Sequence, residues 1–430
     1  MKKFFTCIIM SLLCLGSITV NAQTEEYYTE YCFTYTIANG SATITNCDTT
    51  AEGSIQIPSD FNGYKVTAIA DYAFSGCSNI TYITIPNTVS YIGIAPFYMC
   101  NNLEEIILES GNSSYSVIDG ILFNKNCSIL LSCPATKQGT YTIPNSVTTI
   151  EKYAFYSCSA LSEIIITNNV KEIKSNAFSN CSGLKKIIIP DNVTAIGDYA
   201  FDYCTNLTDI TISNSITRIE EYTFYKCAMT EIDIPDSVVY IGGQAFGRCS
   251  NLTSITIPAD IERIENSVFY NCQSLKTIIF SGNIPTIDDE FYAFTGTPDD
   301  LVIYYNEGAK NSTTSSWLNK SWFSKKVEMI PLIPLIINDI EIVANNSIKA
   351  TVNNPTGIDI SALLIAAVYT DSMTNEVKTV ESVFTKNGET EVTVSFNKEF
   401  NNNDNSLQVY IWKNFKTLRP MASKKEIVIK

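Results

Sequence analysis

The sequence contains no histidine among its 430 residues, and only 17% of its residues are charged. Without histidine the chain cannot build a Ser-His-Asp or Cys-His catalytic arrangement, and it lacks the commonest protein ligand of transition metals. It also has no glycine-rich phosphate-binding loop and no Cys-x-x-Cys motif. The adjacent carboxylates Glu104–Glu105 and Asp288–Glu290 fit a solvated acidic surface better than a catalytic pair. These absences predict a protein that is not an enzyme and that needs no cofactor or metal.

Positive charge is scarce as well, with 29 Lys and Arg against 44 Asp and Glu and a net charge of −15. Phosphate backbones repel such a chain, so nucleic acid is not an expected partner. Residues 1–22 match a secretory signal: Lys2 and Lys3 precede the apolar stretch Phe4–Leu15, and Val20–Ala22 supplies small residues for cleavage. No later stretch reaches the roughly 18 apolar residues that an integral membrane span needs. We therefore expect an extracellular chain, secreted or held at the cell surface.

What the sequence does contain is an internal repeat. A phenylalanine recurs at steps of 22 or 23 residues, interrupted by one step of 58, and a cysteine follows three residues after each. Most copies continue with Leu-x-x-Ile-x-Ile, often followed by proline, as in Leu252–Pro258. The phenylalanines are Phe74, Phe97, Phe155, Phe178, Phe201, Phe224, Phe246 and Phe269, and the cysteines are Cys77, Cys100, Cys158, Cys181, Cys204, Cys227, Cys249 and Cys272.

A coil of 23 residues cannot bury its own apolar face, whereas stacked coils bury it against one another. Leu-x-x-Ile-x-Ile alternates as a short strand does, and a segment such as Val193–Ile196 returns on the opposite side. The pattern predicts a mainly β solenoid of about nine coils of 22–23 residues. We expect an N-terminal cap over 23–65 and the solenoid over 66–330, with its C-terminal cap at 285–330. An irregular insert at 109–141 contains two apolar runs flanking a Lys-Asn-Cys turn, which suggests a hairpin.

The pattern Ile-x-x-x-Ala-Phe-x-x-Cys-x-x-Leu-x-x-Ile-x-Ile-Pro resembles the BspA-like leucine-rich repeats, also called the Treponema-type class. The resemblance covers roughly residues 60–330, and eight copies keep Phe, Cys and Ile in phase. The unit around Asp119–Gly120 is similar to inserts common in that family. The resemblance implies a secreted or surface protein, often linked to adhesion to host proteins or other cells. It does not supply a fixed set of binding residues.

After Pro331 and Pro334 the pattern changes. We expect a linker at 331–337 and an antiparallel β-sandwich over 338–430, because turn residues separate seven strand-like runs. The segment resembles an immunoglobulin-like domain that many secreted bacterial proteins carry as a spacer or docking module. The runs are Ile340–Ile342, Ile348–Val352, Ala362–Tyr369, Val377–Val380, Glu391–Val394, Leu407–Trp412 and Glu426–Ile429.

The repeated cysteines raise the question of disulfides. Side chains in a parallel ladder stay about 5 Å apart, beyond the roughly 3.8 Å between Cβ atoms that a disulfide requires. We therefore expect free, buried thiols that act as small apolar fillers. Cys32 and Cys47 lie outside the ladder and are better candidates for a disulfide.

Binding is expected on the outward positions of the strands, where a mixed apolar and acidic strip on a concave face suits a protein partner. Ile107, Ile165 and Ile188 share one column of this strip. β-Branched residues favour strands in any case, so a purely structural role for these isoleucines stays open. The predicted function is adhesion to extracellular or host proteins; the alternative is a non-catalytic carbohydrate-binding or scaffold subunit, with glycans as partners. The predicted strip comprises Glu105, Ile107, Glu163, Ile165, Lys186, Ile188, Asp209, Glu231 and Asp233.

Overall fold

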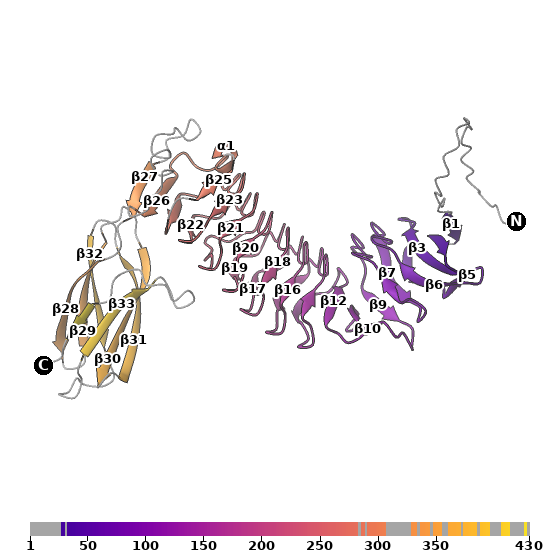
Figure 1. Ribbon diagram of the computed structural model, residues 1–430, viewed down its shortest axis with the longest axis horizontal. Coiled ribbons are helices and arrows are strands. Elements are labelled where there is room, and N and C mark those ends of the chain that lie inside the picture. The colour runs from indigo at the N-terminus through magenta and orange to yellow at the C-terminus, as the bar shows by residue number, and fades with distance from the viewer. Residues whose placement is uncertain are drawn as a thin grey trace, which may run out of the picture.

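The computed structural model shows a stack of β-coils followed by a separate group of longer strands (Figure 1). The signal segment expected at 1–22 lies outside the described residues. No helix within the described ranges is long and apolar enough to cross a membrane. The structure describes residues 27–30, 32–282, 285–288, 290–306, 328–332, 336–344, 347–354, 360–370, 373–384, 388–395, 406–412 and 425–427.

The Leu-x-x-Ile-x-Ile segments form short parallel strands whose outward surface we call the strand face. Alternation decides which side chains point inward: in β17 (Lys186–Ile188), Ile187 is buried while both of its neighbours are exposed. The strands fall into three parallel sheets. These are β4 (Glu52–Gln56), β7 (Asn79–Ile85) and β9 (Glu105–Leu108); β13 (Gly139–Thr142), β15 (Leu161–Ile165), β17 and β19 (Asp209–Thr211); and β22 (Ser254–Ile257), β24 (Thr277–Phe280), β26 (Val302–Asn306) and β27 (Glu328–Leu332).

The Val-x-x-Ile segments form two-residue strands on the opposite side, which we call the return face. In each of these strands the second residue, an isoleucine, is buried and the first points outward or is half-buried. They are β14 (Thr149–Ile150), β16 (Glu172–Ile173) and β18 (Ala195–Ile196) in one sheet, and β20 (Arg218–Ile219), β21 (Tyr240–Ile241), β23 (Arg263–Ile264) and β25 (Thr286–Ile287) in another.

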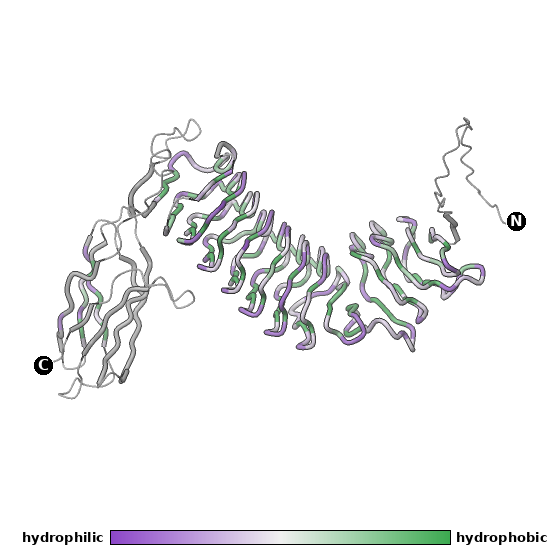
Figure 2. Tube along the Cα trace, in the orientation of Figure 1, coloured by the Kyte–Doolittle hydropathy of each residue, from purple (hydrophilic) through white to green (hydrophobic). Residues whose placement is uncertain are grey.

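The turns around each repeated phenylalanine form a third side of the solenoid, the turn edge. Here N–H groups donate to carbonyls 22 residues later, as from Phe201 to Thr223 at 2.9 Å. The phenylalanine rings stack from Phe155 through Phe294 at centroid distances of 5.2–6.1 Å. Hydrophobic residues recur in every coil (Figure 2), so the core runs along the axis of the stack.

The solenoid has about eleven turns, so the expected number of about nine was too low. The additional turns lack the Phe-x-x-Cys signature on which the count rested. β4, β13, β26 and β27 nevertheless pair parallel with their neighbours. To pair with the parallel sheet, a segment needs an alternating strand and backbone N–H and C=O groups that are available for hydrogen bonding. A phenylalanine in the turn is not needed.

The insert contributes three strands with antiparallel pairing, whereas the strands of the coils pair parallel. β10 (Tyr115–Ile118) and β11 (Ile121–Asn124) form a hairpin, and β12 (Ile129–Ser132) pairs antiparallel with β11 and parallel with β14. The expected hairpin around the Lys-Asn-Cys turn is therefore present. The β10–β11 turn is Asp119–Gly120, with left-handed φ values of 52° and 79°, a combination that favours such residue pairs in two-residue hairpins.

Both ends of the solenoid differ from their expected boundaries. β3 (Ser41–Cys47) pairs parallel with β6 (Tyr64–Ile69), so the first coil begins inside the segment expected as the cap. The outermost strands there are antiparallel: β1 (Tyr27–Glu30) pairs with β2 (Phe33–Ala38), and β2 pairs with β3. β5 (Asp60–Phe61) pairs antiparallel with β6, and β8 (Tyr91–Ile92) pairs parallel with it.

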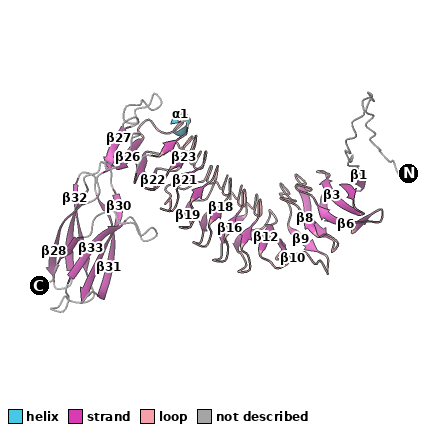
Figure 3. Cartoon of the chain, in the orientation of Figure 1, coloured by secondary structure: helices cyan, strands magenta, loops and turns pink. Residues whose placement is uncertain are grey.

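Strands extend into both ends of the linker expected at 331–337, since β27 ends at Leu332 and the next strand begins at Ile336. Pro331 pairs with Tyr305 within β27, the last strand of its sheet, where a missing N–H is tolerated. Near this end, the short helix α1 (Glu290–Ala293) precedes β26 (Figure 3).

Within the residues that the structure describes, seven strands follow β27, one at each of the seven expected runs. They form two antiparallel sheets, and their packing as an immunoglobulin-like sandwich stays a prediction. The first sheet contains β28 (Ile336–Ala344), β29 (Ser347–Asn354) and β32 (Gly388–Ser395), and the second contains β30 (Ile360–Thr370), β31 (Met373–Phe384), β33 (Ser406–Trp412) and β34 (Lys425–Ile427).

The ladder cysteines are buried free thiols with a defined polar contact. Six of the eight donate to the carbonyl of the phenylalanine in the preceding coil, as Cys204 Sγ does to Phe178 O at 3.2 Å and Cys227 Sγ to Phe201 O at 3.2 Å. Cys158 donates to Pro134 O at 3.6 Å instead. Cysteine therefore fills a small apolar site and also satisfies a buried acceptor. Cys32 and Cys47 are free as well, and the Cys77 thiol contacts the Cys47 carbonyl at 3.6 Å.

We expect the ladder thiols to be inert in the folded protein and free once it unfolds. Burial raises the pKa of Cys181 and Cys249 well above the usual thiol value and that of Cys272 to about 12, which suppresses the reactive thiolate. Mass spectrometry after alkylation, with and without denaturant and without reductant, measures this. Ladder cysteines recovered as disulfides between neighbouring coils would contradict the parallel geometry.

Candidate functional site

Backbone register aligns the outward side chains of the strand face in columns. Glu163 pairs with Lys186 and Lys186 with Asp209, while Ile165 pairs with Ile188 in the adjacent column. A parallel ladder keeps such partners about 5 Å apart along the stack. The sequence-predicted residues of three consecutive coils therefore lie on one continuous surface. We call this surface, composed of Glu163, Ile165, Lys186, Ile188 and Asp209, the strand-face patch.

The strand-face patch combines exposed apolar side chains with paired charges. Ile165 is 43% exposed and Ile188 51% exposed, although both occur in the middle of the solenoid. Beside them Lys186 Nζ lies 2.9 Å from Asp209 Oδ2. The hydrogen bond to Asp209 raises the pKa of Lys186, so this ammonium group stays charged at neutral pH. The arrangement offers an apolar contact bordered by fixed charges.

Ile107 does not join this patch, although it was expected to share one column with Ile165 and Ile188. Its partner is Thr84 in the first sheet, whereas the other neighbour of Ile165 is Thr142 of β13. The insert supplies β13 as an extra strand, and no pairing joins β9 to it. Ile107, which is 37% exposed, and Glu105 therefore form a separate surface on the far side of the insert.

Glu231 and Asp233 are also separated from the patch. The second sheet ends at β19, and Asp233 pairs with Thr256 of the following coil through an isolated β-bridge. The cause is visible in the sequence, because Ile232 follows its cysteine after five residues, whereas Ile210 follows after six. A coil one residue shorter cannot keep both its turn and its strand in register. The nine predicted site residues thus occupy three surfaces.

The turn edge carries a row of tyrosines that is not among the predicted site residues. Its sequence pattern is a tyrosine two residues before the repeated phenylalanine, as at Tyr72, Tyr199 and Tyr222. The rings of Tyr199 and Tyr222 stack at 4.6 Å, and Lys226 Nζ lies 4.1 Å from the ring centre of Tyr203. This edge is therefore aromatic and partly exposed.

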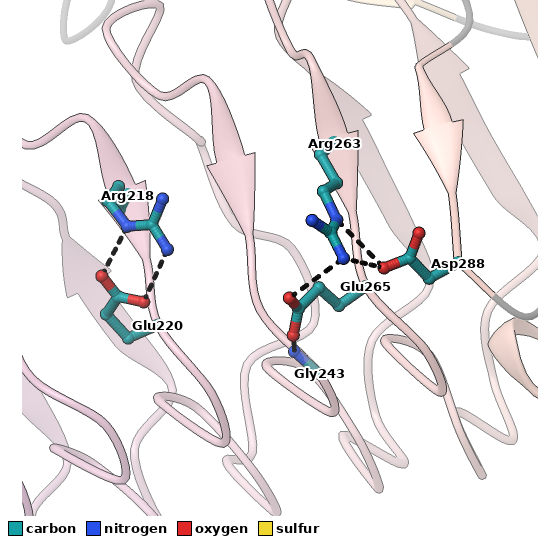
Figure 4. Close-up of polar contacts among 6 residues, drawn as sticks. All are labelled: Arg218, Glu220, Gly243, Arg263, Glu265 and Asp288. Carbon is teal, nitrogen blue, oxygen red and sulfur yellow. Dashed lines mark hydrogen bonds and ion pairs between the residues drawn. The ribbon is translucent and has the colours of Figure 1, made fainter.

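The return face carries charges that are paired with one another. Arg218 binds Glu220 through two hydrogen bonds and lies over the ring of Tyr240 at 3.6 Å. Arg263 lies between Glu265 and Asp288 (Figure 4). A shallow depression of about 400 Å³ lies over Ala195 and Gly197 between such pairs, and among its lining residues are Glu172, Lys174, Ser175, Asp198 and Glu220.

Within the part of the chain that the structure describes, no group of three or more Cys, Asp and Glu is placed to hold a metal ion. The exposed ion pairs of the return face are screened by solvent and contribute little to stability. We therefore regard the strand-face patch as the better candidate for recognition.

Comparison with known proteins agrees with the repeat architecture. The BspA type leucine rich repeat region matches residues 45–134, 131–249 and 217–306 in six copies. A leucine-rich repeat protein of Eubacterium ventriosum is 23% identical, with a TM-score of 0.51, covering 63% of this chain and 94% of that one. A leucine rich cell surface protein of Faecalibacterium prausnitzii is also 23% identical, with a TM-score of 0.36 and coverage of 69% and 98%. No curated protein matches the chain.

The matched segments overlap and together cover residues 45–306, more than half of the sequence. They coincide with the stacked coils from β3 to β26 and include the insert. The chain belongs to the family of BspA-type leucine-rich repeat proteins.

Proposed function

We propose that this chain is an extracellular protein-binding protein of the adhesion type and that the strand-face patch is its contact surface. The observation that carries this proposal is the pair of half-exposed isoleucines, Ile165 and Ile188, side by side on a rigid sheet. Adjacent apolar side chains at the centre of a charged surface are typical of the core of a protein interface, where most binding energy resides. Lys186 and Asp209 would then orient the partner.

Export supports the same proposal. The charged and apolar segments of residues 1–22 have the pattern of a secretory signal, and the family resemblance implies a secreted or surface location. The antiparallel strands of residues 336–427 would act as an immunoglobulin-like spacer or docking module beyond the solenoid. Host or other extracellular proteins are the expected partners, and the ladder would serve only to hold the patch rigid.

Replacing both isoleucines by aspartate, Ile165→Asp with Ile188→Asp, tests the proposal. We expect binding to immobilised extracellular matrix proteins and to intact cells to fall by more than tenfold, because hot-spot residues usually contribute at least 1–2 kcal/mol each. The fold should survive, since both side chains already face solvent. Biolayer interferometry measures the binding and circular dichroism checks the fold.

The matched control is Ile107→Asp, which introduces the same charge at the same strand position on a surface that the insert separates from the patch. It should bind as the wild type does. Undiminished binding by the double variant would exclude the strand-face patch, and the insert at 109–141 would become the next surface to test.

The turn-edge tyrosines favour a second candidate function, recognition of glycans by a non-catalytic scaffold, because aromatic rings stack on sugar faces. Tyr72 and Tyr203 are 41% and 39% exposed. A glycan array separates the two functions. Array binding that is lost in Tyr203→Ala and retained in the double aspartate variant would favour the glycan function.

A further inference from the structure

The backbone ladder of the turn edge is interrupted at one place. N–H groups at the turn positions of Tyr72, Phe74 and Gly76 donate to the following coil, as do those of Tyr153, Phe155 and Ser157. Within residues 32–282, which are described without a gap, no such bond leaves the corresponding groups of Ala95, Phe97 and Met99. The coil of Phe97 is therefore not joined along the turn edge to the coil of Phe155.

The other layers of the solenoid are interrupted at the same point. On the strand face β9 does not pair with β13, and on the return side β8 pairs only with β6. The phenylalanine stack stops as well: Phe97 contacts Phe74 at 5.5 Å, and the stack resumes between Phe155 and Phe178. In a solenoid each coil is stabilised mainly by its neighbours, so this position is the weakest junction in the stack.

The buried side chains accordingly form two separate cores. One extends from Phe33 to Leu122 and the other from Ile121 to Ile303. Strand β11 divides them, because its side chains alternate: Leu122 belongs to the first core, while Ile121 and Phe123 belong to the second. β12 divides in the same way, since Leu130 belongs to the second core and Leu131 packs against the first. The hydrophobic contacts that unite the other coils are therefore replaced here by two-sided strands.

Four tyrosines bridge the junction at the turn edge. The rings of Tyr98 and Tyr156 lie 4.5 Å apart, those of Tyr98 and Tyr153 5.3 Å, and those of Tyr72 and Tyr153 6.0 Å. Tyr72 and Tyr98 come from coils before the insert, and Tyr153 and Tyr156 from the coil after it. Burial and the hydroxyl of Tyr156 raise the pKa of Tyr98 to about 12, as expected for phenols in mutual contact.

We propose that the solenoid consists of two rigid bodies that meet at the insert, and that the cluster of Tyr72, Tyr98, Tyr153 and Tyr156, which we call the tyrosine clasp, holds this joint closed. Aromatic pairs in edge-to-face contact attract one another beyond the area they bury, so four rings can replace the missing turn-edge hydrogen bonds. Each body keeps its own core, so opening the joint does not require unfolding. The device controls the relative position of the surface around Ile107 and the strand-face patch.

A backbone hydrogen bond that crosses the joint reports on its opening: Thr136 donates its N–H to Leu103 O at 3.3 Å. We expect Tyr98→Ala with Tyr156→Ala to raise amide hydrogen exchange at Thr136 at least tenfold. Exchange at Phe201 and Tyr203 should not change, because the ladder around them is intact.

The matched control removes a tyrosine pair within the uninterrupted ladder, Tyr199→Ala with Tyr222→Ala, whose rings stack at 4.6 Å. It should leave exchange at Thr136 at the wild-type rate. If the alanine variant does not fold, Tyr98→Phe with Tyr153→Phe removes the hydroxyl groups and keeps the rings, and a several-fold increase at the same amide is expected.

Small-angle scattering of the same proteins gives a second measurement. A larger maximum dimension in the clasp variant, and in no other, supports a joint that opens. Unchanged exchange at Thr136 in both clasp variants would overturn the proposal. So would an increase spread evenly over the whole solenoid, since that is the result expected of tyrosines that only support the overall fold.

Discussion

Replacing Phe201 by alanine is expected to lower the free energy of unfolding by about 3–5 kcal/mol, the usual cost of a large buried aromatic side chain. Phe201 has no exposed surface, and its ring stacks on Phe178 at 5.2 Å and on Phe224 at 5.7 Å. The substitution leaves a cavity in place of the ring. Neither neighbouring ring can move in to fill this cavity, because both are themselves held in the stack. Urea unfolding followed by circular dichroism measures the change.

Tyr203→Ala is the matched control, since it lies two residues along the same turn and is 39% exposed. Tyr203→Ala should lower the free energy of unfolding much less than Phe201→Ala does. A Phe201→Ala protein with the unfolding midpoint of the wild type would show that the phenylalanine stack does not carry the stability of the solenoid.

Replacing Asp202 by asparagine should stabilise the protein above pH 7 and have little effect near pH 5. Asp202 Oδ1 is buried and accepts no hydrogen bond from any residue that the structure describes. Burial raises the pKa of this carboxyl to about 7, against the opposing effects of Lys226 and the Tyr203 N–H. At pH 8 we expect the free energy of unfolding of the variant to exceed that of the wild type by about 1–2 kcal/mol. This is the lower part of the range for an unsatisfied buried polar group, because solvent screens part of the side chain.

The direction follows from proton linkage. Between pH 4 and about pH 7 the folded protein holds a proton on Asp202 that the unfolded chain, at its ordinary aspartate pKa, has released. The stabilising effect of this proton is lost as the pH rises through that window, so the wild type becomes less stable relative to the variant. Thermal unfolding from pH 4.5 to 8.5 measures the difference. Asp198→Asn, in the same coil, is the control; an Asp202 variant with the pH profile of the wild type would contradict the assignment.

The periodic part of the fold could be predicted from sequence because the same residue types occupy the same buried positions in each coil. A phenylalanine and a cysteine three residues later identify the turn, and alternating isoleucines identify the strand. Coils without that signature, such as those of β4 and β27, could not be counted, because they join the ladder through backbone groups that any alternating strand offers. The break at the insert depends on pairing between segments distant in sequence, which periodicity does not encode.

The candidate site was predicted in part for the same reason. Column positions follow from the repeat, so the alignment of Ile165 with Ile188 was foreseeable. Their separation from Ile107 depends on the extra strand β13 that the insert supplies. The separation from Asp233 depends on a coil one residue shorter, whose effect on register is local. The tyrosine row was visible in the sequence, but side-chain propensity alone does not distinguish an exposed ring from a core ring.

The Asp119–Gly120 turn bears on how the chain avoids self-association. A sheet that stops in the middle of a molecule exposes backbone groups to which a strand of another molecule can add, the first step towards aggregation. Here the Gly120 carbonyl accepts the Ile106 N–H, and a side chain at Gly120 would come within 3.2 Å of Glu105 Cγ. The turn thus occupies the free edge of β9 within its own chain. The interruption that divides the solenoid therefore also blocks intermolecular strand addition at this edge.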